Sequence, residues 1–402
     1  MKKWLLIIPI VLLIGFGIYK IGSKMYWDYR IEHAIINVEI ANPYVEVYEE
    51  KVYANQFVKE MNGHMKKNPK IDTTKLGKQE VTFEYINEED LLIPYTFEVE
   101  VVDTTSPFIF RGSTKTISED FKYDVVTDLI CIDNYDPNPK CTIEGEYDQH
   151  SPGSYNVTFV GEDSSGNKST HPFTLVVRRK SNSTSSSGGG YSYYNDFQEI
   201  REKYAGENTE FGIDISHHQG DINFQKVKEA GVDFAYIRIG RGNGVGKEYV
   251  EDKNFEQNLK GFNEVGIPVG VYFYSNANGV EDAKKEADWL LKKTKNYKVD
   301  LEYIFDWENW NDVQEYDLSI YGLREMYKAF AKEIQKNKKE AMLYSSKNYL
   351  ENIWGMEWTT PVWLAHYTEQ TNYSGQYRVW QLCENGKVDG ISGGVDLNIR
   401  YK

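Results

Sequence analysis

The stretch Tyr303-Ile-Phe-Asp-Trp-Glu308 is a short apolar run that ends in two carboxylates. Similar apolar runs lie on both sides of it, and amphipathic stretches separate most of them. A strand-then-helix order over roughly 200 residues predicts a parallel sheet, open or closed into a barrel, with its chemistry at the carboxyl ends of the strands. The other runs are Phe211–Ile215, Phe234–Ile239, Pro268–Tyr274, Ala341–Tyr344 and Val362–Ala365.

The pair Asp306 and Glu308 stands at such a strand end. Residues two apart on a strand project to the same face, and neighbouring carboxylates repel, so one is pushed toward its protonated form. Glycoside cleavage needs this arrangement, because one group protonates the leaving oxygen and the other stabilises positive charge at the sugar. Asp-x-Glu is also common on solvated surfaces, but the preceding apolar run favours the catalytic interpretation. The same rule selects Asp214, at the end of the first run, and Asp396, near the end of the sequence.

Two segments in the first half of the chain repeat with a shared offset of 76 residues. Gly77–Phe83 reappears as Gly153–Phe159, and Phe97–Val101 reappears as Phe173–Val177. Short runs with period-2 alternation predict two tandem antiparallel sandwiches. With Asp103-Thr-Thr-Ser-Pro107 at their join, the copies resemble the bacterial Ig-like domains of surface proteins.

The N-terminal segment begins with Met1-Lys2-Lys3 and continues as an uncharged apolar run from Trp4 to Tyr19. A basic start before such a run is typical of a secretory signal or a signal anchor. No small-x-small cleavage site follows, so the sequence favours an uncleaved transmembrane helix over a cleaved signal. We therefore expect a single-pass protein of the cell membrane whose C-terminal bulk is extracellular and faces the cell wall.

A Ser/Gly-rich stretch, Lys180–Gly190, lacks apolar residues and predicts a flexible linker. It separates the alternating strands from the strand-then-helix region. The expected parts are a transmembrane helix at 1–27, sandwiches at 28–103 and 104–179, a linker at 180–204 and a barrel domain at 205–402.

Cys131 and Cys141 flank a Pro- and Asn-rich loop. In an exported domain we expect a disulfide between them, the alternative being two free, partly buried thiols. Cys383 has no apparent partner and is expected to be free. The loop lacks the spacing of a calcium site, and the adjacent His217-His218 lacks the spacing of a zinc pair, so we expect no metal.

The net charge is −15, from 46 Lys and Arg against 61 Asp and Glu. This balance argues against a nucleic-acid partner, because phosphate neutralisation needs clustered Lys and Arg. The 31 Tyr and 9 Trp are common in carbohydrate-binding proteins and also in β-sandwich cores.

Six motifs run in order through residues 208–402: Phe211-Gly-Ile-Asp-Ile-Ser-His-His-Gln-Gly220, Gly266-Ile-Pro-Val-Gly-Val-Tyr-Phe-Tyr274, Asp306-Trp-Glu308, Trp363-Leu-Ala-His-Tyr367, Val379-Trp-Gln381 and Gly394-Val-Asp-Leu-Asn398. Together they resemble the family 25 glycoside hydrolases, the Chalaropsis-type lysozymes. The resemblance implies a modified (β/α) barrel that cleaves the β-1,4 bond from N-acetylmuramic acid to N-acetylglucosamine in peptidoglycan, with no cofactor.

The resemblance also assigns roles to residues that match the motifs. Glu308 would be the general acid, Asp306 would orient or stabilise a participating N-acetyl group, and Asp214 and Asp396 would complete an acidic cleft. His218 stands where the family usually carries Trp, which would alter a subsite wall rather than the chemistry. The sugar subsites would be lined by Tyr272, Tyr274, Trp363, Tyr367, Trp380 and Gln381, although aromatic residues inside apolar strands, such as Trp363 and Tyr272, can also be core.

Two functional classes remain open at this point. One is a membrane-tethered muramidase that remodels the cell wall, with peptidoglycan strands and the membrane as partners. The other is a non-catalytic peptidoglycan-binding or adhesion protein on a lysozyme fold. The presence of all four carboxylates favours the enzyme. No partner is predicted for the Ig-like domains.

Overall fold

The computed structural model describes the backbone of residues 4–110, 112–122, 125–126, 130–180, 196–310, 313–355 and 358–402. Most of the predicted Ser/Gly linker, 181–195, therefore lies outside the described residues. The chain divides into two compact units, Met1–Thr104 and Thr105–Lys402. Each unit is described by itself.

Helix α1 (Trp4–Glu32) forms where the N-terminal apolar run predicts a helix. Among the described residues, however, no helix is both long enough and apolar enough to cross a membrane. The predicted transmembrane helix is therefore not found.

The rest of the first unit is an all-β domain. Its strands are β1 (Val38–Ile40), β2 (Tyr44–Glu46), β3 (Val58–Met61), β4 (Gly63–Lys67), β5 (Gly77–Asn87) and β6 (Leu92–Val102), and a 3-10 helix, η1 (Ala54–Phe57), precedes β3. β1 pairs with β3, and the other strands form a sheet in the order β2-β6-β5-β4. Alternate residues of β5 and β6 point into the core, where Phe83, Tyr85 and Val99 are fully buried.

A second all-β domain opens the second unit. Its strands are β7 (Phe108–Phe110), β8 (Thr114–Ser118), β9 (Ile130–Ile132), β10 (Lys140–Glu144), β11 (Gly153–Glu162) and β12 (Lys168–Arg178). Their order, β10-β11-β12-β8, matches the first domain, and Gly153 pairs with Val177 as Gly77 pairs with Val101. The repeat predicted from the sequence is therefore also a repeat of strand pairing, in which equivalent residues of the two domains have equivalent partners. The N-terminal region is all-sheet, and its Ig-like identity stays a prediction.

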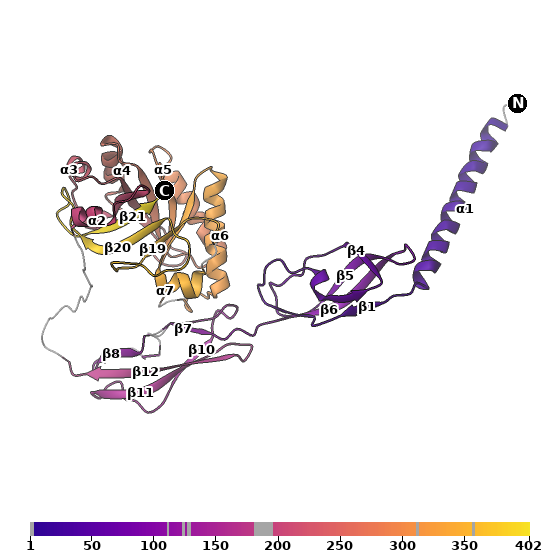
Figure 1. Cartoon of the computed structure of the whole chain (residues 1–402), viewed down its shortest axis with the longest axis horizontal. Helices are drawn as coiled ribbons and strands as arrows, with labels where there is room; N and C mark the ends of the chain where they lie inside the picture. Colours follow the sequence, from indigo (N-terminus) through magenta and orange to yellow (C-terminus); the bar gives the residue numbers. More distant parts are fainter. Residues whose placement is uncertain are drawn as a thin grey trace. The chain divides into compact units, whose positions relative to one another are not determined.

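The remaining strands form a barrel (Figure 1). They are β13 (Thr209–Ile215), β14 (Phe234–Arg241), β15 (Val250–Glu251), β16 (Val269–Ser275), β17 (Tyr303–Trp307), β18 (Ala341–Ser346), β19 (Val362–Ala365), β20 (Val379–Gly386) and β21 (Val395–Tyr401). The order β13-β21-β20-β19-β18-β17-β16-β14-β15 is closed by a pairing of β13 with β14. The predicted barrel is confirmed, and β21 modifies it by running antiparallel to both β13 and β20.

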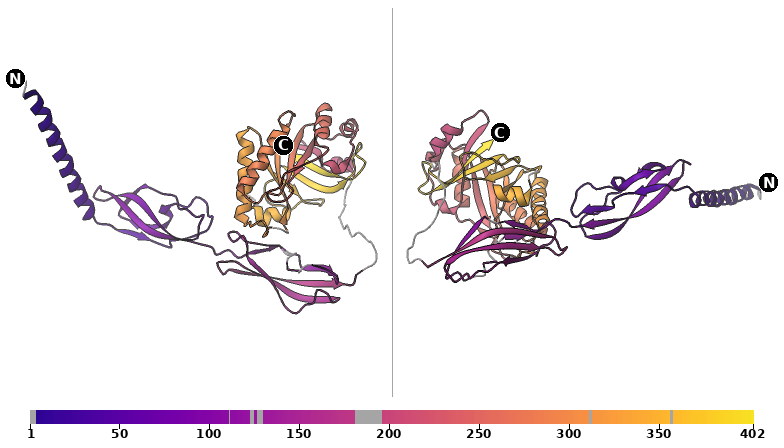
Figure 2. Two further views of the ribbon diagram at one scale, coloured as in Figure 1. Left: turned by 180° about the vertical axis from the view of Figure 1, so that it is seen from behind. Right: turned by 60° about the horizontal axis from the view of Figure 1, so that its bottom comes forward.

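Helices lie outside this ring of strands (Figure 2). They are α2 (Phe197–Tyr204), α3 (Phe224–Glu229), α4 (Phe255–Glu264), α5 (Val280–Thr294), α6 (Ile320–Lys336) and α7 (Lys347–Tyr349), with short turns η2 (His217–Gln219) and η4 (Leu350–Trp354). The amphipathic α6 buries Leu323, Met326 and Phe330 on one face, and the side chain of Ser319 caps its start by accepting from Gly322 N.

The end of the barrel opposite the carboxyl ends of the parallel strands is closed by a buried ion cluster. Glu302, fully buried just before β17, accepts from Arg378 at 2.8 Å, Arg400 at 3.2 Å and the Tyr236 hydroxyl at 2.8 Å. These paired charges fill the amino-terminal end of the barrel, so ligand chemistry is left to the other end.

Candidate active site

All four predicted carboxylates lie at one end of the barrel. Asp214 is next to last in β13, and Asp396 faces it directly across antiparallel β21. Asp306 is next to last in β17, and Glu308 follows that strand. The negative charge of Asp214 raises the pKa of each of the other three, which places them within one electrostatic cluster.

Asp306 and Glu308 share a side-chain hydrogen bond but differ in exposure. Asp306 is 4% exposed, and burial together with the charge of Glu308 holds its pKa well above the usual range. Glu308 borders solvent, yet desolvation by the surrounding protein also raises its pKa. Two neighbouring carboxyls that both resist ionisation favour sharing one proton, and their hydrogen bond raises the pKa of Asp306 while it lowers that of Glu308.

Asp214 and Asp396 form a second pair of carboxyl groups with raised pKa values. Asp214 is buried, and its Oδ2 accepts from Gln381 Nε2 at 3.0 Å and from Asn398 Nδ2 at 2.8 Å. Burial and the charge of Asp214 raise the pKa of Asp396 to about 10. Asp396 is therefore protonated at neutral pH. Burial also raises the pKa of Asp214, and the hydrogen bonds from Asn398 and Gln381 oppose that rise.

A cleft of 640 Å³ opens beside Glu308. Trp310 and Tyr349 form one part of its wall, with stacked rings whose centroids lie 3.8 Å apart. Tyr344 and Tyr367 also line the cleft. Flat aromatic faces with hydroxyl groups in an open groove are suited to binding sugar rings.

Gln381, predicted to line a sugar subsite, instead links the cleft to the acidic cluster. Its side chain is buried, and its Oε1 accepts from the hydroxyls of Tyr344 at 2.9 Å and Tyr367 at 3.1 Å. Of the other predicted subsite residues, Tyr367 is 40% exposed at the cleft, and Tyr272 and Tyr274 are half-buried on β16. Gln381 therefore orients two tyrosines and Asp214 rather than meeting solvent.

Trp363 and Trp380, which were also predicted to line a sugar subsite, are buried. Trp380 is 3% exposed, and its Nε1 donates to His366 O at 2.8 Å. Adjacent residues on a strand point to opposite faces, so Trp380 points away from the interior that Gln381 enters. Trp363 is 2% exposed inside the barrel, where its Nε1 donates to Asn398 Oδ1 at 2.8 Å. Both rings pack in the core, and their subsite role stays a prediction.

Sequence reasoning missed Tyr344, Trp310 and Tyr349. Tyr344 pairs with Asp306 in register, so the rule that selected strand-end residues could have found it. Trp310 follows β17 and Tyr349 belongs to α7, and these two rings meet only in the folded chain. No local pattern in the sequence identifies such a pair.

His218, where the family usually has Trp, lies at the rim beside His217, with ring centroids 4.1 Å apart. His217 is held by the buried Asp252, which accepts its backbone N–H at 3.1 Å and also pairs with Arg238. Burial lowers the pKa of His218, and the positive charges of His217 and Arg238 lower it further. His218 therefore presents a neutral ring at neutral pH.

Cys131 and Cys141 are joined by a disulfide with an S–S distance of 2.21 Å, and Cys383 is free and buried.

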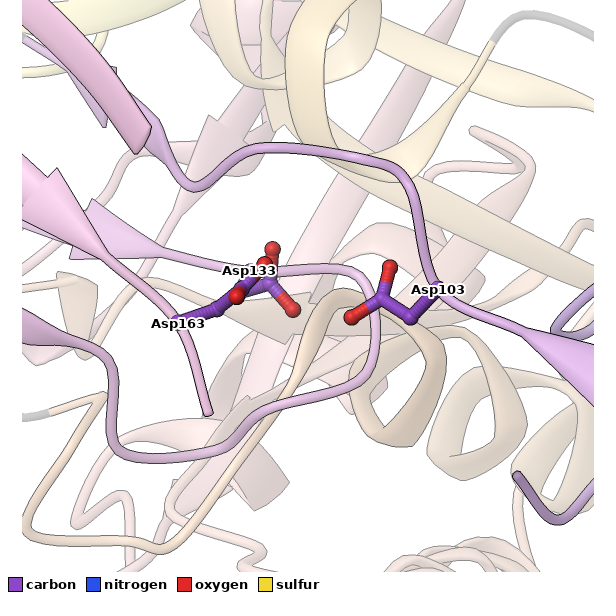
Figure 3. A group of neighbouring side chains, drawn as sticks. All are labelled: Asp103, Asp133 and Asp163. Atoms are coloured by element: carbon purple, nitrogen blue, oxygen red, sulfur yellow. The ribbon is translucent and has the colours of Figure 1, made fainter. Parts of the chain in front are cut away.

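Outside the barrel, buried carboxylates have the oxygen ligands that a cation prefers. Figure 3 shows three of them, Asp103, Asp133 and Asp163, each following a strand. The Oδ1 atoms of Asp133 and Asp163 accept hydrogen bonds from the backbones of their own turns.

Comparison with known proteins identifies relatives of the barrel domain. The model of glycosyl hydrolases family 25 matches residues 213–391. Lysozyme M1 of Streptomyces globisporus is 30% identical over 200 residues, which cover 46% of this chain and 66% of that protein. The uncharacterized protein YegX of Escherichia coli K12 is also 30% identical over 200 residues, covering 48% of this chain and 69% of that protein.

Among solved structures, the bacterial lysozyme from Streptomyces coelicolor aligns with 26% identity and a TM-score of 0.42. The alignment covers 49% of this chain and 94% of that chain. The chain thus spans just under two thirds of the first lysozyme relative. The residues matched by the family model, 213–391, lie in the C-terminal half of this chain.

Proposed function

Because this chain belongs to glycosyl hydrolases family 25, we propose that it hydrolyses the β-1,4 bond between N-acetylmuramic acid and N-acetylglucosamine in peptidoglycan. The observation that carries this proposal is the hydrogen-bonded pair Asp306 and Glu308 at the edge of an open, aromatic-lined cleft. The name of the Streptomyces globisporus relative, a lysozyme, supports the same reaction.

In this mechanism Glu308 is the general acid. It gives the proton that the pair shares to the oxygen of the departing sugar as the C1–O bond breaks, which leaves Asp306 ionised; desolvation, which raises the pKa of Glu308, and its position at the cleft allow this. A water molecule later attacks C1, and the ionised Glu308 takes the proton of that water. The two steps return Glu308 to its starting state.

Asp306 acts on the substrate's N-acetyl group. Its Oδ1 is buried and has no hydrogen-bond partner among the described residues, so it offers an acceptor for the acetamido N–H. Holding that N–H turns the acetyl oxygen toward C1, where it bonds as the leaving group departs and forms a cyclic oxazolinium ion. The Asp306 carboxylate stabilises this cation, and attack by water retains the configuration at C1.

The site of action in this proposal is the outer side of the cell membrane, facing the wall, where peptidoglycan lies. The disulfide between Cys131 and Cys141 supports export, because disulfides persist in oxidising compartments. Protease added to intact cells stripped of their wall should remove the barrel domain. Full protection from the protease would contradict this location.

Mass spectrometry of muropeptides after digestion of purified peptidoglycan tests the reaction. The expected products carry new reducing ends on N-acetylmuramic acid. Reducing ends on N-acetylglucosamine would indicate a glucosaminidase, and anhydromuramic ends would indicate a lytic transglycosylase. Binding without any product would identify a non-catalytic wall-binding protein.

A further inference from the structure

Residues 130–141 of the second β-domain, here named the docking loop, pack against the barrel within the same compact unit. Ile130 is 9% exposed and Ile132 is 1% exposed. Both belong to the hydrophobic cluster that contains Trp310, Val313 and Ile320 of the barrel. Burial of two isoleucines in a shared core indicates a fixed contact rather than a loose tether.

The docking loop also completes the start of α6. The first backbone N–H groups of a helix have no acceptor within the helix. Here Ile320 N donates to Asp133 O at 2.8 Å, and Tyr321 N donates to Asn134 O at 3.3 Å. The helix that follows the catalytic strand therefore begins against carbonyls of the second β-domain.

Gln314 connects the barrel to both ends of the docking loop. Its Nε2 donates to Pro139 O at 3.1 Å and to Cys131 O at 3.4 Å, and it lies 3.5 Å from Cys141 Sγ. Because the disulfide joins Cys131 to Cys141, it fixes the spacing of the groups that Gln314 contacts.

The segment held in this way lies next to the cleft. Tyr316 and Trp310 both pack on Trp307, with ring centroids 6.3 Å and 4.9 Å from it. Trp310 in turn stacks on Tyr349 to form the cleft wall beside Glu308. A shift of the segment that follows Trp310 would therefore move one face of the cleft.

We infer that the docking loop is a positioning element of the cleft, through which the disulfide-closed second β-domain fixes the wall formed by Trp310 and Tyr349. The second β-domain is then part of the catalytic unit and not a passive spacer. Gln314 is a positioning residue that touches no substrate. This inference goes beyond the proposed function and rests on it for its activity readout.

The test uses the full chain and two variants, Gln314→Ala and the double variant Cys131→Ser/Cys141→Ser. On peptidoglycan fragments, kcat/KM should fall about fivefold, the equivalent of one net hydrogen bond, chiefly through a higher KM. The pH optimum should stay unchanged, because no proton-transferring group is altered. Reducing the disulfide should lower the kcat/KM of the wild type to a similar extent and leave the kcat/KM of the double variant unchanged. Gln225→Ala, which removes an exposed hydrogen bond on α3, is the matched control and should behave as wild type.

Amide hydrogen exchange of residues 313–322 measures docking without reference to turnover. Ile320 and Tyr321 should exchange slowly in the wild type and faster in both variants. Affinity for a glycan oligomer, measured in a Glu308→Gln background, tests the position of the cleft wall without any need for turnover. If the wild-type chain proves inactive, the proposed function fails, but the affinity measurement still tests the positioning role. Faster exchange with unchanged kcat/KM and affinity would overturn the positioning role. Unchanged exchange in both variants would overturn the docking itself.

Discussion

Replacing Glu308 with Gln keeps the size and shape of the side chain but removes the proton that the departing sugar oxygen needs. Glu308 borders solvent at the cleft, so the change should not disturb the core. A general acid contributes about 10²–10⁴-fold to the rate, so kcat should fall by that factor, the equivalent of roughly 3–5 kcal/mol in the barrier. KM should change little, because Trp310, Tyr344 and Tyr349 still line the cleft.

The assay is steady-state release of reducing ends from soluble peptidoglycan fragments, with a matched control in the same cleft. Glu384 also lines the cleft, and Glu384→Gln removes a carboxylate there without removing the acid. It should retain nearly wild-type kcat. An aryl glycoside whose leaving group departs without a proton should be hydrolysed by Glu308→Gln with a much smaller loss. A Glu308→Gln chain that degrades peptidoglycan at the wild-type rate would refute the mechanism.

Four further predictions concern other parts of the chain. Asp306→Asn should reduce kcat severely with the cleft intact, because a neutral amide cannot stabilise the oxazolinium ion; unchanged turnover would exclude that role. Cys131→Ser/Cys141→Ser should lower the free energy of unfolding by about 2–3 kcal/mol in denaturant melts, and the denatured, unreduced wild type should show one reactive thiol rather than three. Trp380→Ala should lower the free energy of unfolding by about 3–5 kcal/mol, as at other core positions. The KM of the folded enzyme should stay the same, and a raised KM would support the predicted subsite role of Trp380. Burial raises the pKa of Glu286 from 4.5 to about 8. Its contribution to the free energy of unfolding is therefore complete below pH 4.5 and is lost as the pH rises through 8. In thermal scans, Glu286→Gln should reduce this loss of stability with rising pH.

Part of the acidic cluster was predictable because Asp214 and Asp306 follow from local information, whereas Asp396 lies near the start of the antiparallel strand β21. An apolar run marks a buried strand, and the carboxyl end of a parallel strand in a barrel faces the site. Asp214 and Asp306 satisfy this rule directly. The tandem β-domains were predictable for a similar reason, since a repeat at one offset reports a repeated strand pairing such as Gly77 with Val101 and Gly153 with Val177.

The errors and omissions come from information that a local pattern does not carry. Trp380 and its neighbour Gln381 were both predicted to line a subsite, although adjacent strand residues point to opposite faces. Trp310 and Tyr349 are brought together by the path of two loops. The contacts of Gln314 with the docking loop depend on the packing of one domain on another, for which the sequence has no signal.

Asp214 and Asp396 belong to the first and last strands of the barrel, and Asn398 reaches Asp214 across 184 residues of sequence. A chain that leaves a ribosome or a secretion channel from its amino end therefore presents no complete acidic cluster until β21 has emerged. The order of synthesis thus delays assembly of the acidic cluster to the last strand, so that a chain without β21 has neither Asp396 nor the hydrogen bond from Asn398 to Asp214.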